Sequence, residues 1–200
     1  MTSRREFLQV AAATGLPVIA AGPVNAATAM GVTPLPTDIH AVLVDRRHAA
    51  SRRVGARLAS AGAQVQAMPD ADITHVWLHQ IGPAWRQRPV AIAGLTARSA
   101  LFCLEQLALS RGLRVVFHGE HVIHPDGRTE HSILRGAQRA QISARDLTHA
   151  GAQWPALVAD ALTRHRRTTG PERFGPSDAA LEPALPSGAQ LLTSWIIAPV

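Results

Sequence analysis

The chain has 200 residues, of which 46% are hydrophobic, and a formal net charge of +6 at pH 7. This length and apolar content are typical of one domain with an ordinary core. All twenty basic residues are arginine, and they are dispersed, whereas a nucleic-acid-binding face normally clusters them, so we expect no nucleic-acid partner.

Residues 1–29 combine an arginine pair, a short apolar run and small residues. The motif is Ser3-Arg4-Arg5-Glu6-Phe7-Leu8. It resembles the twin-arginine (Tat) export signal, with Arg4, Arg5, Phe7 and Leu8 at the matching positions and Gln9 where lysine is common. The apolar run that follows is too short and too weakly apolar for a comfortable membrane span. The resemblance implies that the Tat machinery exports the folded protein to the periplasm or beyond. Membrane contact would then occur only during export or through an uncleaved signal.

The next segments predict a strand, a helix and a second strand. Residues 30–38 are rich in Pro and Thr and indicate a flexible lead-in. Ile39–Asp45 is an apolar run that ends in a carboxylate, as a buried parallel strand does. Residues 46–61 have apolar positions at helical spacing, with Gly62 after them as a stop, and residues 63–68 predict a weaker strand.

Residues 73–85 follow a turn and fit a short helix better than a strand, because their apolar positions lie at i, i+4, i+5 and i+8. His75 and His79 would share a face of this helix at a spacing that zinc helices use. The glutamate of the protease motif is missing between them. Two surface histidines are therefore the favoured interpretation.

Residues 88–119 have the order and length of a βαβ unit. Residues 90–93 are the predicted strand, Gly94-Leu95 the turn and Thr96 the N-cap of a helix that stops at Gly112. A further strand is expected at residues 113–117. The only cysteine, Cys103, lies in the apolar helix pattern and is expected to be buried and inert.

The alternation of strands and helices predicts an α/β fold. We expect a small doubly wound, mainly parallel sheet with flanking helices and an added β-hairpin. Trp154-Pro155 opens a last predicted helix. The expected organisation is a signal and cleavage region at 1–29, a lead-in at 30–38, the α/β domain at 39–167, a Pro/Gly-rich arm at 168–190 and a C-terminal apolar strand at 191–200, added to the sheet edge.

The hairpin contains the first set of candidate ligands. A two-residue type I′ turn at Asp126-Gly127 would pair His124 with Thr129 and place four polar side chains on one face. These are His118, Glu120, His124 and His131. Two imidazoles and a carboxylate are a recognised set for zinc or iron, and His118 could join only if the strand bends. The alternative is a polar hairpin face in water.

The carboxyl edge of the strands is the second candidate site, because ligands of open parallel sheets bind there. The candidate residues are Asp45, Gly94, Thr96, Arg98 and Ser99. The start of a helix beside Arg98 would suit an anion. The alternatives are that the glycine and threonine serve only as turn and cap, and that Asp45 caps the next helix or acts as a metal ligand or base.

These patterns lead to three functional hypotheses. The first is an exported, periplasmic or secreted α/β protein that binds a small, anionic ligand or a protein partner. The second is a metal-dependent enzyme that uses the histidines and glutamate of the hairpin. The third is a non-catalytic accessory subunit of an exported redox enzyme. No catalytic residue can be assigned from the pattern.

Overall fold

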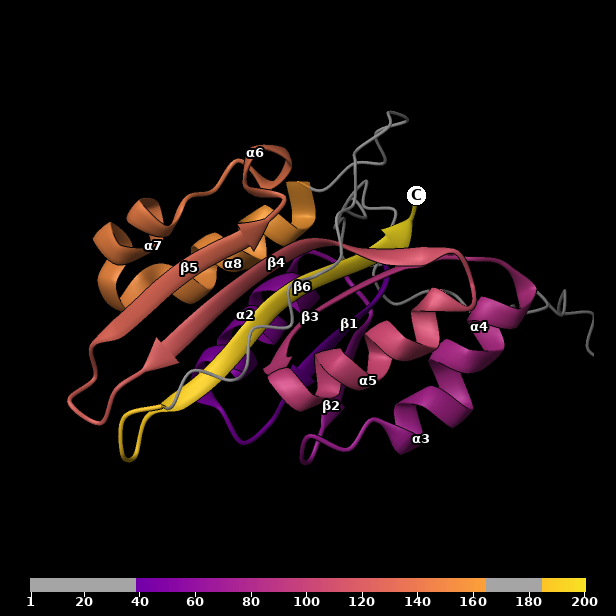
Figure 1. Ribbon diagram of the computed structural model, residues 1–200, viewed down its shortest axis with the longest axis horizontal. Helices are drawn as coiled ribbons and strands as arrows, with labels where there is room; N and C mark the ends of the chain where they lie inside the picture. The colour runs from indigo at the N-terminus through magenta and orange to yellow at the C-terminus, as the bar shows by residue number, and fades with distance from the viewer. Residues whose placement is uncertain (1–38, 165–184) are drawn as a thin grey trace, which may run out of the picture. The chain divides into compact units, whose positions relative to one another are not determined.

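A six-stranded mixed sheet lies at the centre of the protein (Figure 1). The computed structural model describes residues 39–164 and 185–200. The predicted export signal, the lead-in and most of the Pro/Gly-rich arm lie outside these residues. The strand order is β2-β1-β3-β6-β4-β5. The strands are β1 (Ile39–Asp45), β2 (Val65–Met68), β3 (Ala91–Ala97), β4 (Leu113–Ile123), β5 (Thr129–Arg135) and β6 (Gln190–Pro199).

Four of these strands run in the same direction. β1 pairs in parallel with β2 and with β3, while β3 and β4 each pair antiparallel with β6. β1 and β3 are buried along almost their whole length, as strands covered on both faces must be. The predicted α/β class is confirmed, and the added hairpin is formed by β4 and β5, which pair antiparallel.

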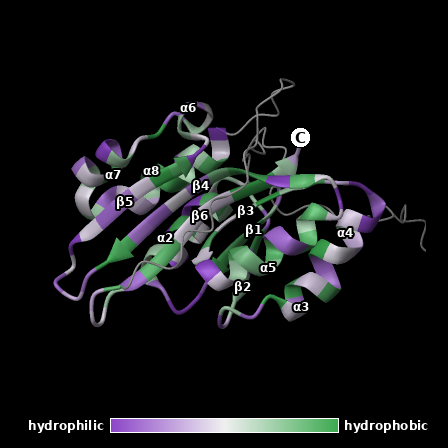
Figure 2. Ribbon diagram, in the orientation of Figure 1, coloured by the Kyte–Doolittle hydropathy of each residue, from purple (hydrophilic) through white to green (hydrophobic). Residues whose placement is uncertain are grey.

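Helices cover both faces of the sheet, and a separate apolar core lies between the sheet and the helices on each face. One face carries α2 (Ala49–Ser60), α6 (Ala137–Ala140), α7 (Ala144–Ala150) and α8 (Trp154–Arg164), and the other α3 (Thr74–Val76), α4 (Gly82–Gln87) and α5 (Arg98–Leu109). Apolar residues follow the central strands, whereas β5 and the hairpin loop are largely hydrophilic (Figure 2). Within the described ranges, no helix has the length and apolar character needed to cross a membrane.

The helices predicted at 46–61, at 73–85 and from Trp154 onwards are confirmed, with small shifts at the ends of the first two. The second of these is divided, because a π-helical turn at Trp77–Ile81 joins α3 to α4. His75 and His79 are exposed on it, with ring centroids 4.7 Å apart. The expectation for Cys103 was wrong. Its thiol is exposed on α5, because the buried stripe of that helix is formed by its neighbours Leu101 and Leu104.

β6 is a central strand, and the prediction of an edge position for residues 191–198 was wrong. It lies between β3 and β4 and pairs antiparallel with both. Its side chains alternate between the two cores, with Leu192 and Ile196 on the α8 face and Trp195 and Ile197 on the α5 face. A strand that is apolar on both faces has no solvent-facing side, and this explains why it takes a central place.

The turn predicted at Gly94-Leu95 does not exist, because β3 continues to Ala97. Gly94 is a buried strand residue, and a Cβ there would lie 2.6 Å from the Trp195 ring and 2.7 Å from the Leu43 carbonyl oxygen. Thr96 is buried and is not the N-cap of α5; that position is held by Ala97, without a side-chain hydrogen bond. The glycine therefore marks a close packing contact.

The hairpin forms, but its predicted register was wrong by one residue on β4. Ile123 pairs with Thr129 and His121 pairs with His131. The Gly127 amide donates to the His124 carbonyl at 2.9 Å, and Gly127 alone in the loop has a positive φ, of 85°. A three-residue loop with a left-handed glycine replaces the type I′ turn, in which Asp126 would also need positive φ. A shift of one residue turns the facing side chains to the opposite face.

Candidate functional site

A pocket of about 500 Å³ opens at the edge of the sheet where β1 and β4 end and where β5 and β6 begin. It lies on the α2 and α8 side, because the start of α2 and the connection from α7 to α8 also line it. This is the carboxyl edge of the parallel strands, where ligands of such sheets bind. The pocket thus lies at the edge where the sequence predicts ligand binding, but a different set of residues lines it.

The polar lining of the pocket is basic. Its charged and imidazole side chains are His48, Arg53, Arg128 and His131. Among the described residues that line it, none is acidic. The Arg128 guanidinium forms an ion pair with the carboxylate of Glu130, which is not among the lining residues. A small anion is the kind of solute that such a lining stabilises.

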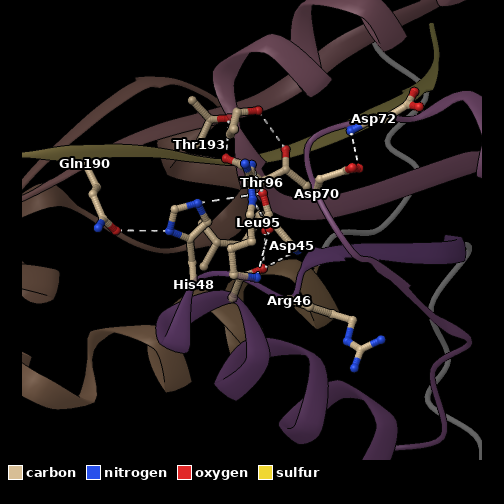
Figure 3. A network of polar contacts seen from close by, with 12 residues as sticks. Asp45, Arg46, His48, Asp70, Asp72, Leu95, Thr96, Gln190 and Thr193 are labelled. Atoms are coloured by element: carbon tan, nitrogen blue, oxygen red, sulfur yellow. Dashed lines mark hydrogen bonds and ion pairs between the residues drawn. The ribbon is translucent and has the colours of Figure 1, made fainter.

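Asp45 is fully buried and lies beside His48, which lines the pocket (Figure 3). Its buried carboxylate accepts hydrogen bonds from the backbone and guanidinium of Arg47 at 2.7–3.0 Å. The His48 ring lies between this carboxylate and Gln190, with Nε2 3.7 Å from Asp45 Oδ2 and Nδ1 3.1 Å from Gln190 Oε1. Burial raises the pKa of Asp45, but the hydrogen bonds and charge of Arg47, with His48, outweigh this effect and lower it.

The start of α2 is tied to the sheet beside Asp45. The buried Ser51 hydroxyl accepts a hydrogen bond from the Asp45 amide at 2.8 Å and donates one to the Leu95 carbonyl of β3. N-capping by Asp45 is not observed, because His48 occupies the N-cap position of α2 without a side-chain bond. Asp45 was predicted as a ligand-binding residue. In the structure its carboxylate is buried and does not line the pocket, and it lies next to His48, which does.

A second imidazole of the pocket is held by a buried polar chain. The Nδ1 atoms of His131 and His121 are 2.8 Å apart, and Nε2 of His121 is 2.9 Å from the hydroxyl of Ser194. His121 and Ser194 are both fully buried. The His121 ring stacks on Trp154 at a centroid distance of 4.5 Å, and His131 meets the same indole edge-on at 5.2 Å. His131 is thus positioned by His121 of β4 and Trp154 of α8.

Both rings of this pair are neutral at neutral pH. Burial lowers the pKa of His121 to about 3, with a further contribution from the neighbouring His131 and His118. Burial also lowers the pKa of His131 to about 4. The pair therefore acts through neutral N–H donors and nitrogen lone pairs rather than through a positive charge.

The predicted anion site at residues 94–99 is not assembled at a surface. Gly94 and Thr96 are buried, and the Thr96 hydroxyl accepts a hydrogen bond from the Trp195 indole N–H at 3.0 Å. Arg98 lies on the α5 side with its guanidinium 3.6 Å from the Glu120 carboxylate, and Ser99 is exposed. These residues are separated because β3 ends at Ala97, four residues beyond the end that the sequence indicated.

The structure also separates the predicted metal ligands. His131 faces the α8 side, whereas His124 turns to the other face, where its Nε2 is 3.1 Å from Glu130 Oε1. His118 lies 3.9 Å from the Glu120 carboxylate, and burial together with the charges of Arg98 and Arg135 lowers its pKa to about 4. In residues 39–164 and 185–200, no three His, Cys, Asp or Glu side chains are arranged to hold a metal ion.

Sequence reasoning missed His48, Arg53, His121, Arg128 and Ser194. One signal was available: Pro125-Asp126-Gly127 suits a type I turn with proline at its second position followed by a left-handed glycine. That loop would have placed His121 opposite His131. Nothing local marks Arg53 or Ser194, since their roles depend on contacts with distant segments.

Comparison of the chain with models of protein families, with curated proteins and with solved structures finds no match. The fold and the site define an α/β protein with a basic pocket at the carboxyl edge of its sheet. What this pocket can bind follows from its residues.

Proposed function

We propose that this chain is an exported α/β protein that binds a small anionic ligand in the pocket between the start of α2, the β4–β5 hairpin and the start of α8. The observation that supports the proposal is the lining, which contains two arginines and two histidines and, among its described residues, no carboxylate. Arg53 lies on α2 and Arg128 in the hairpin loop, and both line the pocket.

The dimensions of the pocket favour a small ligand. Its volume of about 500 Å³ lies in the range of roughly 300–1,000 Å³ that is typical of small-molecule sites. Trp154 does not offer a stacking platform, because it is buried and one face of its ring already packs on His121. Recognition therefore depends on charge and hydrogen bonds at the polar wall.

Thermal unfolding in sulfate, phosphate and succinate, each compared with chloride at equal ionic strength, tests the binding. At 100 times the dissociation constant a ligand stabilises by about 2.7 kcal/mol, which is a shift of roughly 5–10 °C for a protein of this size. We expect such a shift for the wild type with at least one of these anions. The variant Arg53→Ala/Arg128→Ala should lose it.

Arg86→Ala is the matched control, since Arg86 is also exposed but lies on α4, which packs on the other face. This variant should retain the full shift. If none of the three anions stabilises the wild type, or if the double variant keeps the shift, the proposed function is wrong.

Export is the second part of the proposal, and its support is the motif at residues 3–8. Cell fractionation tests it. Replacement of both Arg4 and Arg5 by lysine should leave the protein in the cytoplasm, and export of that variant at the normal level would contradict a Tat route.

A further inference from the structure

A continuous polar chain connects the buried centre of β6 to the pocket. It runs from the Ser194 hydroxyl through His121 of β4 to His131 of β5, over contacts of 2.9 Å and 2.8 Å. His131 is the only one of the three that lines the pocket. The hydrogen atoms in this chain decide whether the pocket meets an N–H donor or a nitrogen lone pair.

Nε2 of His131 is open to the pocket. Its Nδ1 is occupied by His121, and the structure gives Nε2 no protein partner among the described residues. Among the described residues, the buried side-chain nitrogens without a hydrogen bond are Nε2 of His118 and Nε2 of His124, and each of these has a carboxylate within 4.0 Å. Since Nε2 of His131 is neither bonded nor among these buried atoms, it is the atom that a ligand can contact.

The two possible directions of hydrogen bonding are not equivalent. Each neutral imidazole carries one N–H, so the Nδ1–Nδ1 contact takes its hydrogen from one of the two rings. If His131 donated, the N–H of His121 would lie on Nε2 and point at the Ser194 oxygen. The Ser194 hydroxyl hydrogen would then be buried without an acceptor among the described residues, which is the unfavourable arrangement.

In the opposite direction, the hydrogens of Ser194 and His121 both find an acceptor. Ser194 donates its hydroxyl hydrogen to Nε2 of His121, and His121 donates its Nδ1–H to Nδ1 of His131. The single hydrogen of His131 must then be on Nε2. This ring nitrogen is a donor at the pocket wall.

We infer that Ser194 and His121 fix His131 as its Nε2–H tautomer, so that this imidazole joins Arg53 and Arg128 as a donor and the pocket selects an oxyanion whose contacted oxygens carry no proton. The part of this inference that concerns the ligand rests on the proposed function. Sulfate and carboxylates belong to the selected class. Ser194 and His121 are positioning residues, since neither lines the pocket.

Nitrogen-15 NMR of the full chain at pH 7.5 tests the tautomer without any ligand. Correlations between ring nitrogens and ring carbon-bound protons distinguish the Nε2–H from the Nδ1–H form, and a spectrum of His131→Gln assigns the ring. We expect Nε2–H for His131 and Nδ1–H for His121. An Nδ1–H form of His131, or averaged signals from two forms, overturns the inference.

Two variants at Ser194 test the origin of the effect. Ser194→Ala removes the hydroxyl donor, so the pair loses its fixed direction and the His131 signals should become averaged. Ser194→Cys keeps a weak S–H donor in the same place and should keep the Nε2–H form. A fixed Nε2–H form in Ser194→Ala would overturn the role assigned to Ser194, and if neither variant folds, the wild-type spectrum still decides.

Calorimetric titration with sulfate links the tautomer to recognition. Ser194→Ala should bind sulfate about threefold to tenfold more weakly than the wild type, as expected for a weakened hydrogen bond, and Ser194→Cys should lie between them. Equal affinity of Ser194→Ala and wild type would overturn the selection of an oxyanion by His131. If the wild type binds no sulfate, phosphate or succinate, the proposed function fails, while the NMR result on the tautomer is unaffected.

Discussion

Gly94 has a structural role that its sequence context conceals. It stands between Ala93 and Leu95 in β3, and the Trp195 ring of the neighbouring strand lies where a Cβ would project. The contact with the Leu43 carbonyl oxygen closes the space from the other side. A backbone atom cannot move away as the end of a flexible side chain can, so the glycine is required by packing and not by a turn.

Gly94→Ala should therefore destabilise the protein by about 1–3 kcal/mol, the usual cost of overpacking a core. The measurement is the free energy of unfolding from urea denaturation. Ser99→Ala is the control, because Ser99 is exposed at the start of α5 and surface substitutions usually change stability by less than about 0.5 kcal/mol. An equal effect of the two substitutions would show that the contact with Trp195 is not restrictive.

At the scale of the element, β6 joins the two halves of the sheet. The parallel strands β1, β2 and β3 lie on one side of it and the β4–β5 hairpin on the other. Seven consecutive residues of β6, Leu192–Ala198, are buried. Full burial of a large apolar side chain contributes about 1.5–3 kcal/mol, so Trp195, Ile196 and Ile197 together approach the roughly 5–15 kcal/mol of a whole domain.

Removal of residues 190–200 should abolish cooperative unfolding, because the hairpin and the parallel strands lose their common neighbour. Circular dichroism and urea denaturation measure this. A chain that lacks only Val200, which is exposed, should unfold like the full chain. Loss of an edge strand would leave the rest of the sheet connected. A cooperative transition in the chain that lacks residues 190–200 would therefore contradict the central position of β6.

At the scale of the whole molecule, neutral histidines lie on both faces of the sheet. His121 and His131 belong to the α8 side, and His118 lies on the α5 side near Arg98. Burial lowers the pKa of all three below the ordinary 6.5, to about 3 for His121 and about 4 for the other two. The unfolded chain therefore binds protons between pH 6.5 and 4 that the folded protein does not.

The contribution of these three histidines to the free energy of unfolding is fully present above about pH 6.5. It falls as the pH decreases towards the folded pKa values, because protons then bind preferentially to the unfolded chain. When the pH is lowered from 7.5 to 5, His121 alone should decrease the free energy of unfolding by on the order of 2 kcal/mol. Urea denaturation at the two pH values checks this, with His121→Gln as the comparison. The same loss in that variant would exclude His121 as the source; carboxylates such as Asp45, whose pKa is also lowered, lose their contribution only at more acidic pH.

The candidate site could be predicted only in part. A pocket lies at the carboxyl edge of the strands, where the α/β class alone predicts that a ligand binds. The residues that line this edge could not be predicted, because each depends on where a strand ends or on the register of the hairpin. The extension of β3 buried Gly94 and Thr96, and the one-residue shift of the hairpin separated His131 from His124.

The sequence by itself determined the α/β class, the position of most helices and the existence of the hairpin, because these depend on hydrophobic periodicity and on glycine and proline within a few residues. The tertiary structure decided the central place of β6 and the polar chain that ends at the pocket. Ser194 lies 73 positions from His121 along the chain, and Trp195 lies 99 positions from Thr96, to which it donates a hydrogen bond. Local patterns carry no information on such pairs, since they form only when the two strands pack side by side and the cost of burying their polar groups selects the partners.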